Sequence, residues 1–170
     1  MLKSRNLVLA TLSVGLASCT SPVSSPSQSS PQVQRIHDVR TTAYTHTESD
    51  HVAYGVKTAA GSNLKYGSIR SAAADWSVYP VGTVFQIEGD PTMYEVDDYG
   101  SALVGTSTID LYKPSKAAMN AWGVRHVSIK VVKWGSFIKS LALMKPREKK
   151  SPHVREMVRK LERGTPRAVS

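Results

Sequence analysis

Cysteine is almost missing from this sequence of 170 residues, in which Cys19 is the single example. One cysteine excludes an intramolecular disulfide, whatever the redox state of the compartment. The share of hydrophobic residues, 41%, is that of a globular protein with a packed core. We therefore expect a fold that holds together without a disulfide framework.

Motifs for metal, phosphate and nucleophilic chemistry are missing as well. His46 and His51 lie five positions apart with no cysteine nearby and no HExxH pattern, so we expect them to be solvated rather than to bind a metal. The sequence contains no glycine-rich phosphate-binding loop and no Ser/His pattern of a nucleophilic hydrolase. We therefore expect neither a metal ion nor a cofactor.

Acidic residues are scarce relative to basic ones, 13 against 22, which gives a formal net charge of +9. A strongly basic body would indicate a nucleic-acid partner. Residues 145–170, however, hold nine basic and three acidic side chains, and residues 1–19 hold two more basic ones. The charge left for residues 20–144 is +1, so we expect no nucleic acid among the partners.

A hydrophobic run long enough to cross a membrane is also lacking at the amino terminus. The apolar run there, residues 7–17, follows two basic residues and is too short to span a bilayer as a mature helix. This pattern predicts a signal peptide over residues 1–18. It ends in the letters LASC, which resemble the lipobox of bacterial lipoproteins and imply a lipid anchor on Cys19. The alternative is a signal-peptidase site beside an incidental cysteine.

Residues 20–34 contain almost only Ser, Pro, Gln, Thr and Val, a composition too polar to bury a core. We expect residues 19–37 to be the lipidated cysteine with a disordered linker. By the same lipoprotein resemblance, a threonine rather than an aspartate at position 20 favours sorting to the outer membrane. The expected location is therefore the cell envelope, on the outer membrane facing the periplasm.

From residue 38 to residue 135 the chain consists of short segments separated by turn residues, not of long stretches with helical periodicity. Strands are expected at 39–45, 52–56, 83–88, 94–98, 108–112 and 124–134. Residues 114–122 predict one short helix, which Gly123 ends. About six strands and one short helix predict a mainly β fold, a small barrel.

Two of the expected strands flank a loop with Gly100 and Gly105, which can turn at positive φ. Asp98 ends the first of these strands, and Asp110 lies within the second. Alternation places Asp110 opposite its apolar neighbours, and it places Asp98 on the apolar side of its strand, with Tyr94. The alternative interpretation is that both are ordinary loop aspartates, which bond backbone amides.

Several short motifs follow one another in a fixed order along this body. They are TAYT at 42–45, AD at 74–75, PVGT at 80–83, VDDYG at 96–100, VG at 104–105, IDLY at 109–112 and AWGVR at 121–125. Together they resemble the three-aspartate (3D) domain, a double-psi β-barrel of cell-wall proteins and of the catalytic part of membrane-bound lytic transglycosylase A. The resemblance covers residues 40–134 and implies a six-stranded double-psi barrel. Val104 stands where the family's loop usually has a lysine.

The resemblance also implies roles for single residues. Asp75, Asp98 and Asp110 are the three aspartates, and Asp110 matches the catalytic acid of the transglycosylase. Such an enzyme uses the C6 hydroxyl of the sugar as its nucleophile, so one carboxyl can act first as acid and then as base. Asp98 then tunes and orients Asp110, and Asp75 is structural or positions the substrate. The expected substrate-binding residues are Tyr44, Gly100, Gly105 and Tyr112.

The two tyrosines are expected to stack on sugar rings, with packing in the barrel core or rim as the alternative. As a whole, the sequence predicts a lipid-anchored protein that cleaves the glycan strands of peptidoglycan, in the manner of a lytic transglycosylase. The alternative is a non-catalytic glycan-binding barrel that places the lipoprotein against the cell wall. Retention of all three aspartates favours the enzyme.

Residues 136–170 are an extension whose second half predicts a basic amphipathic helix. Ser151 can cap it, Pro152 suits its first turn and Gly164 can end it. The expected apolar stripe consists of Val154, Met157, Val158 and Leu161, and the basic stripe of Arg155, Arg159, Lys160 and Arg163. We expect the helix either to hold an anionic surface or to pack on the barrel.

Overall fold

The computed structural model describes residues 33–47 and 55–164. The expected signal peptide, the lipid anchor on Cys19, most of the linker and most of the strand at 52–56 therefore lie outside the described residues. In the part of the chain that is described, no helix is long and apolar enough to cross a membrane.

Six strands close into a barrel, as the sequence predicted. They are β1 (Gln34–Tyr44), β2 (Ile69–Ala74), β3 (Val84–Ile87), β4 (Met93–Asp98), β5 (Ile109–Tyr112) and β6 (Arg125–Lys133). Their order around the barrel is β1-β5-β2-β4-β3-β6, with β1/β5 and β2/β4 parallel and the other neighbours antiparallel. Closure gives each strand a hydrogen-bonded neighbour strand on both sides, so the sheet has no free edge strand.

The barrel interior is apolar, and strand alternation explains which side chains fill it. Ile109 and Leu111 in β5 are fully buried, as are Ala72 and Ala74 in β2. Asp110 lies between the two apolar residues of β5 and therefore points away from the interior. The alternation of this strand thus places the carboxylate on the outer wall of the barrel, as predicted.

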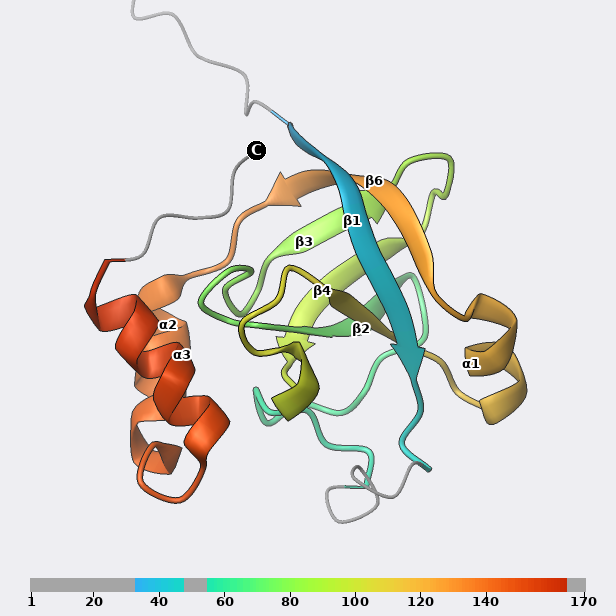
Figure 1. The fold of residues 1–170 in the computed structure, drawn as a ribbon. Coiled ribbons are helices and arrows are strands. Elements are labelled where there is room, and N and C mark those ends of the chain that lie inside the picture. Colours follow the sequence, from blue (N-terminus) through green and yellow to red (C-terminus); the bar gives the residue numbers. More distant parts are fainter. Residues whose placement is uncertain (1–32, 48–54, 165–170) are drawn as a thin grey trace, which may run out of the picture. The chain divides into compact units, whose positions relative to one another are not determined.

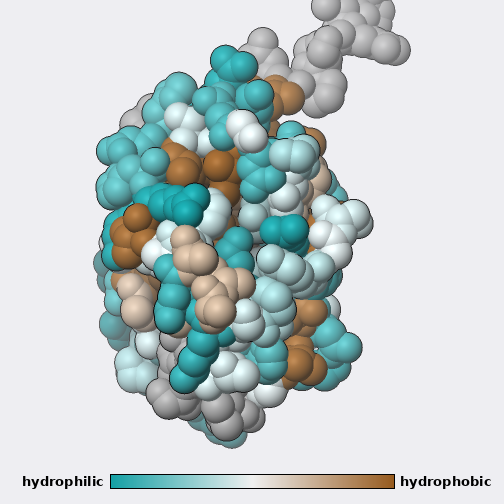
Figure 2. Space-filling model, turned by 90° about the vertical axis from the view of Figure 1, so that its right-hand side faces the viewer, coloured by the Kyte–Doolittle hydropathy of each residue, from teal (hydrophilic) through white to brown (hydrophobic). Residues whose placement is uncertain are grey.

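Three helices accompany the barrel, and α1 (Lys116–Trp122) has the predicted ends. The hydroxyl of Ser115 accepts a hydrogen bond from the amide of Ala118, and Gly123 ends the helix at a φ of 62°. In Figure 1, α1 lies on one side of the barrel, while α2 and α3 lie together on the other. On the face that carries α1, apolar side chains form small separate patches among hydrophilic ones (Figure 2).

The carboxyl-terminal extension contains one helix that the sequence did not predict. It is α2 (Phe137–Met144), joined by the 3-10 turn η3 (Lys145–Arg147) to the predicted helix, α3 (Pro152–Glu162). Ser136 caps α2 by accepting a hydrogen bond from the amide of Lys139. A segment of eight residues is too short for helical periodicity to separate it from a strand, which is why α2 was missed.

The apolar stripe of α3 packs into the main core, which was one of the two alternatives for this helix. Val154, Met157 and Val158 are fully buried, and each such burial stabilises the fold by roughly 1.5–3 kcal/mol. The amide of Trp76 donates to the sulfur of Met157 at 3.3 Å. Ser151 is the N-cap residue as expected, but its hydroxyl makes no capping hydrogen bond.

Candidate active site on the barrel wall

Two of the three aspartates lie in one row across four adjacent strands. Thr42 of β1 pairs with Asp110 of β5, which pairs with Ala73 of β2, which in turn pairs with Asp98 of β4. Because neighbouring strands are about 4.8 Å apart, the Cα atoms of Asp98 and Asp110 are separated by roughly 10 Å. The side chain of Ala73 lies between the two carboxylates, is 4% exposed and packs with Tyr44, Leu103 and Tyr112.

A β-bulge in β4 decides which way Asp98 points. Val96 pairs with Ala72 and Asp98 pairs with Ala73, so Asp97 is an extra residue in this strand. The expectation that Asp98 shares the side of Tyr94 is therefore wrong. The bulge turns Asp98 to the outer wall, where it faces the same side as Ala73. Strand alternation cannot reveal such an insertion, because it assumes an uninterrupted period of two.

The carboxylate of Asp98 is held in one orientation by three donors. The amides of Ala59 and Tyr99 donate to Oδ1, both at 2.9 Å, and the hydroxyl of Tyr44 donates to Oδ2 at 3.2 Å. Asp98 itself is only 5% exposed. This carboxylate is built into the wall, so it acts on its neighbours through charge and position rather than by moving.

Asp110 is the more accessible of the two carboxylates, since it is half-buried. The hydroxyl of Thr42 donates to its Oδ1 at 2.6 Å. Thr42 belongs to the TAYT motif at 42–45, but the sequence analysis did not predict a functional role for it. Its place opposite Asp110 in the parallel pair gives it a positioning role that only the register reveals.

The two tyrosines that were expected to stack on sugars are largely buried. Tyr44 is 8% and Tyr112 is 6% exposed, and their ring centroids are 5.6 Å apart. They pack with Ala73 and Leu103 in a small cluster on the outer wall. Packing, the alternative interpretation, therefore describes both rings. Burial, followed by the charge of Asp98, raises the pKa of Tyr44 well above its ordinary value.

The exposed aromatic side chain beside this cluster is Tyr66, which the sequence analysis did not single out. It is 41% exposed, and its ring meets that of Tyr112 edge-on at 6.2 Å. His46 also belongs here, because its Nδ1 lies 2.9 Å from the hydroxyl of Tyr112. The expectation of a solvated His46 is therefore wrong, since it is half-buried, while His51 lies outside the described residues.

The two loop glycines differ from each other. Gly105 has a φ of 85°, a conformation that favours glycine, and its amide donates to Asp75 Oδ2 at 2.8 Å. Gly100 has a φ of −133°, which is extended backbone open to any residue. The expected positive φ is thus found at Gly105 and not at Gly100.

Asp75 is completely buried and accepts hydrogen bonds from inside the protein. The amide and hydroxyl of Ser77 donate to Oδ1 at 2.8 and 2.6 Å. Oδ2 accepts from Gly105 and also lies 3.4 Å from the ammonium group of Lys160 in α3. Asp75 therefore ties the loop of the site to the carboxyl-terminal helix.

A further acidic cluster, which the sequence analysis missed, lies next to the row. Lys65 Nζ lies 2.9 Å from Asp97 Oδ2 and 2.7 Å from Glu95 Oε2, and the hydroxyl of Ser71 donates to the same oxygen of Asp97. Burial raises the pKa of Asp97, against the opposing influence of Lys65. Among the described residues, no cluster of three or more His, Cys, Asp and Glu side chains could hold a metal ion.

Comparison with known proteins agrees with this barrel. Residues 70–133 match the family model of the 3D domain. The chain is 35% identical over 96 residues to the cell wall-binding protein YocH of Bacillus subtilis (strain 168), covering 56% of this chain and 32% of that protein. It is 33% identical over 107 residues to YabE of the same organism, which is named for cell wall shaping, covering 62% of this chain and 25% of that protein. The chain thus spans a third or less of the length of these relatives.

Proposed function

We propose that this protein, whose residues 70–133 match the family model of the 3D domain, cleaves the glycan strands of peptidoglycan in the manner of a lytic transglycosylase. The observation that carries this proposal is the row on the barrel wall. It presents a half-buried carboxylate, Asp110, held by Thr42 at 2.6 Å. A second carboxylate, Asp98, is fixed two strands away on the same face.

The proposed reaction requires one carboxyl group that both gives and takes a proton. Asp110 donates its proton to the glycosidic oxygen as the bond to the anomeric carbon breaks. The C6 hydroxyl of the same sugar then attacks that carbon and closes an anhydro ring, and its proton passes to the Asp110 carboxylate. The acid is thereby regenerated, and no water molecule has to be activated by a second carboxylate.

Asp98 is proposed as a positioning residue for this step. Its three donors hold a carboxylate in place on the far side of Ala73. A fixed negative charge at that distance would stabilise the positive charge that builds up on the sugar in the transition state. Preorganisation of this kind costs nothing at the moment of reaction, because the carboxylate is already immobile.

The names of the two relatives support a cell-wall partner. One is named a cell wall-binding protein and the other is named for cell wall shaping. We propose peptidoglycan as the partner and the cell envelope as the location. The lipid anchor on Cys19 and the outer membrane facing the periplasm remain part of the proposal. So does the layout of a signal peptide at 1–18, a linker at 19–37, a barrel domain at 38–135 and an extension at 136–170.

A non-catalytic glycan-binding barrel is the second candidate function. The name of YocH, a cell wall-binding protein, favours it. On this alternative, Asp110 and its neighbours only hydrogen-bond to sugar hydroxyl groups. The two functions can be told apart by their products, because cleavage creates anhydro ends on the glycan and binding alone creates none.

The test is digestion of purified sacculi followed by detection of anhydro-ended products by mass spectrometry. We expect products from the wild type and a rate lower by roughly two to four orders of magnitude in Asp110→Asn, which keeps the shape but loses the transferable proton. Asp38→Asn is the matched control, because the Asp38 side chain is 83% exposed and pairs with His126 away from the row. A folded Asp110→Asn variant with undiminished activity would contradict the proposal, and a wild type without anhydro products would favour the binding function.

A further inference from the structure

Two cationic side chains face each other at one end of the barrel. Arg70 lies near the start of β2, and Lys113 directly follows the end of β5. In this antiparallel pair Ala72 lies opposite Leu111, so continuing the register brings Arg70 opposite Lys113. Burial lowers the pKa of Lys113 most, and the positive charge of Arg70 lowers it further.

Lys113 is buried without an acidic partner among the described residues. It is 6% exposed, and no hydrogen bond or ion pair of its ammonium group is formed with residues 33–47 or 55–164. Its Nζ lies instead 4.5 Å from the ring centre of Trp122 and 5.9 Å from that of Tyr94. Aromatic rings compensate a lost hydration shell only weakly, so burial of this cation is costly.

Two further donors beside Lys113 are also left without an acceptor. The Nε of Arg70 and the hydroxyl of Tyr94 are both buried and have no hydrogen-bond partner in the described part of the chain. Tyr94 is the register partner of Arg70 in the β2/β4 pair, so these donors lie at the same end of the barrel. Buried donors in proteins are nearly always paired, so two unpaired ones beside the ammonium group of Lys113 indicate a place for an acceptor.

The nearest acidic group does not supply that acceptor. The carboxylate of Asp90 accepts a hydrogen bond from the amide of Thr92 at 2.8 Å. Arg70 and Lys113 lower the pKa of Asp90, but less than its bonds to Thr92 do. No ion pair joins Asp90 to either cation in the described ranges, so Asp90, whose charge opposes the lowering of the Lys113 pKa, neutralises the two cations only in part.

We propose that Arg70, Lys113 and Tyr94 form a binding site for one carboxylate group. The identity of the ligand rests on the proposed function. The carboxylate belongs to the peptide stem of the same peptidoglycan strand whose sugar lies at Asp110. Oxygen atoms of a carboxylate accept from Lys, Arg and Tyr donors together, and the net charge of the two cations suits an anion.

Tyr66 connects this site to the row on the barrel wall. Its ring lies under the guanidinium group of Arg70, 4.3 Å from the carbon atom of that group. The same ring contacts Tyr112, which lies two residues after Asp110 on β5. Asp110 and Lys113 are three residues apart, a separation of about 10 Å along an extended chain. Because Asp110 faces outward and Lys113 lies on the face of Leu111, a single ligand would reach both sites over the end of the barrel, past the exposed ring of Tyr66.

Calorimetric titration with N-acetylmuramoyl dipeptide and with its methyl esters tests the site. We expect the wild type to bind the free acid at least tenfold more tightly than the ester. Lys113→Met and Arg70→Gln, which keep most of the buried stems, should lower the affinity for the acid to that for the ester. Lys116→Met is the matched control, since Lys116 is exposed and loses the same charge. Equal affinity of the wild type for acid and ester, or no binding of either, overturns the proposal.

A second arm separates carboxylate binding from a general attraction for anions. Inorganic phosphate that displaces the dipeptide tenfold more effectively than acetate does would assign the site to phosphate and overturn the carboxylate proposal. Thermal unfolding gives an independent measurement, because removing one of two facing cations relieves repulsion. We expect Lys113→Met to have a higher Tm than the wild type in anion-free buffer, and acetate to raise the Tm of the wild type more than that of the variant.

The outcomes also separate this site from the proposed enzyme activity. If sacculi yield no anhydro products but the free acid is still preferred through Lys113, the site stands and the transglycosylase proposal fails. If anhydro products form while acid and ester bind alike, the activity stands and the carboxylate site fails.

Discussion

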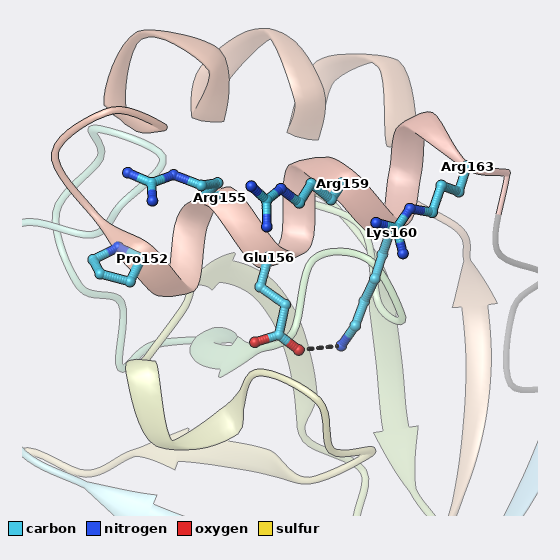
Figure 3. A pocket seen from close by; sticks show the side chains of 6 residues that line it. All are labelled: Pro152, Arg155, Glu156, Arg159, Lys160 and Arg163. Carbon is cyan, nitrogen blue, oxygen red and sulfur yellow. Dashed lines mark ion pairs between the residues drawn. The ribbon is translucent and has the colours of Figure 1, made fainter.

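The barrel wall and the carboxyl-terminal helices use charged residues in opposite ways. On the wall, Asp98 and Asp75 are buried and are bonded mainly to backbone amides and hydroxyl groups. On α3, Glu156 and Lys160 pair with each other at 3.0 Å on a partly exposed surface, as Figure 3 shows. Bonds to the backbone fix a carboxylate in space, whereas exposed ion pairs contribute little to stability. The wall is thus suited to holding a site, and the helices to supporting it.

Asp75 and Lys160 are where the two regions meet. The ammonium group of Lys160 lies 3.4 Å from a carboxylate that is itself fully buried. The glycine loop bonds to the same oxygen through the amide of Gly105. The three aspartates of the family motif are therefore not equivalent, because one joins the loop to the helix while two face the outer wall.

Among the variants that test this comparison, Asp75→Asn is expected to have the largest effect on stability. The side chain of asparagine has one acceptor oxygen where aspartate has two, so some of the donors around Asp75 would lose their partner. We therefore expect the free energy of unfolding to fall by about 3 kcal/mol or more. Lys160→Met, which removes only a partly exposed cation, should cost about 1 kcal/mol or less. Urea unfolding of both variants measures the difference. Equal losses would mean that the helix, and not the backbone amides, holds Asp75.

Local rules predicted much of the fold. Alternation placed Asp110 opposite Ile109 and Leu111, and the capping signals placed α1 between Ser115 and Gly123. The apolar stripe at helical spacing predicted α3. Each of these features depends on residues within a few positions of one another, so the sequence carries the information directly.

Contacts between distant segments could not be predicted in the same way. The extra residue Asp97 in β4 changes the facing of Asp98 without changing the local composition. The bond from Thr42 to Asp110 joins residues 68 positions apart, and the contact of Lys160 with Asp75 joins residues 85 positions apart. These features follow from strand register and helix docking, which are properties of the closed barrel rather than of a sequence window.

A medium-sized effect is expected from the basic face of α3, for which we propose contact with an anionic surface. A hollow on this face is lined by Pro152, Arg155, Glu156, Arg159, Lys160 and Arg163 (Figure 3). Replacing Arg155, Arg159 and Arg163 by Gln leaves the buried stripe intact, unlike a deletion of the helix. We expect binding to anionic vesicles or sacculi to weaken about tenfold at low salt and to lose its salt dependence. Binding that is unchanged across a salt series would discard this contact.

The smallest expected effect is on the pH dependence of stability, to which Asp97 contributes. Its pKa in the folded protein is raised chiefly by burial, whereas the pKa of the partly exposed Lys65 is raised by hydrogen bonds to Glu95 and Asp97. The pKa shift of Lys65 indicates a favourable ion pair, whereas the pKa shift of Asp97 indicates a net cost of burying its charge. Desolvation acts most strongly on the buried partner, and Asp97 is 3% exposed, so the cost of burial dominates.

An acid whose pKa is higher in the folded than in the unfolded state binds more protons when folded. Its contribution to stability therefore falls as pH rises from the unfolded pKa through the folded one. Asp97→Asn keeps the bond to Ser71 but carries no charge to desolvate. We expect the free energy of unfolding of the wild type to decline relative to Asp97→Asn from about pH 4 upward, as measured by urea unfolding at a series of pH values. A wild type that gains stability relative to the variant over this range would show that the ion pair with Lys65 outweighs the burial of the carboxylate.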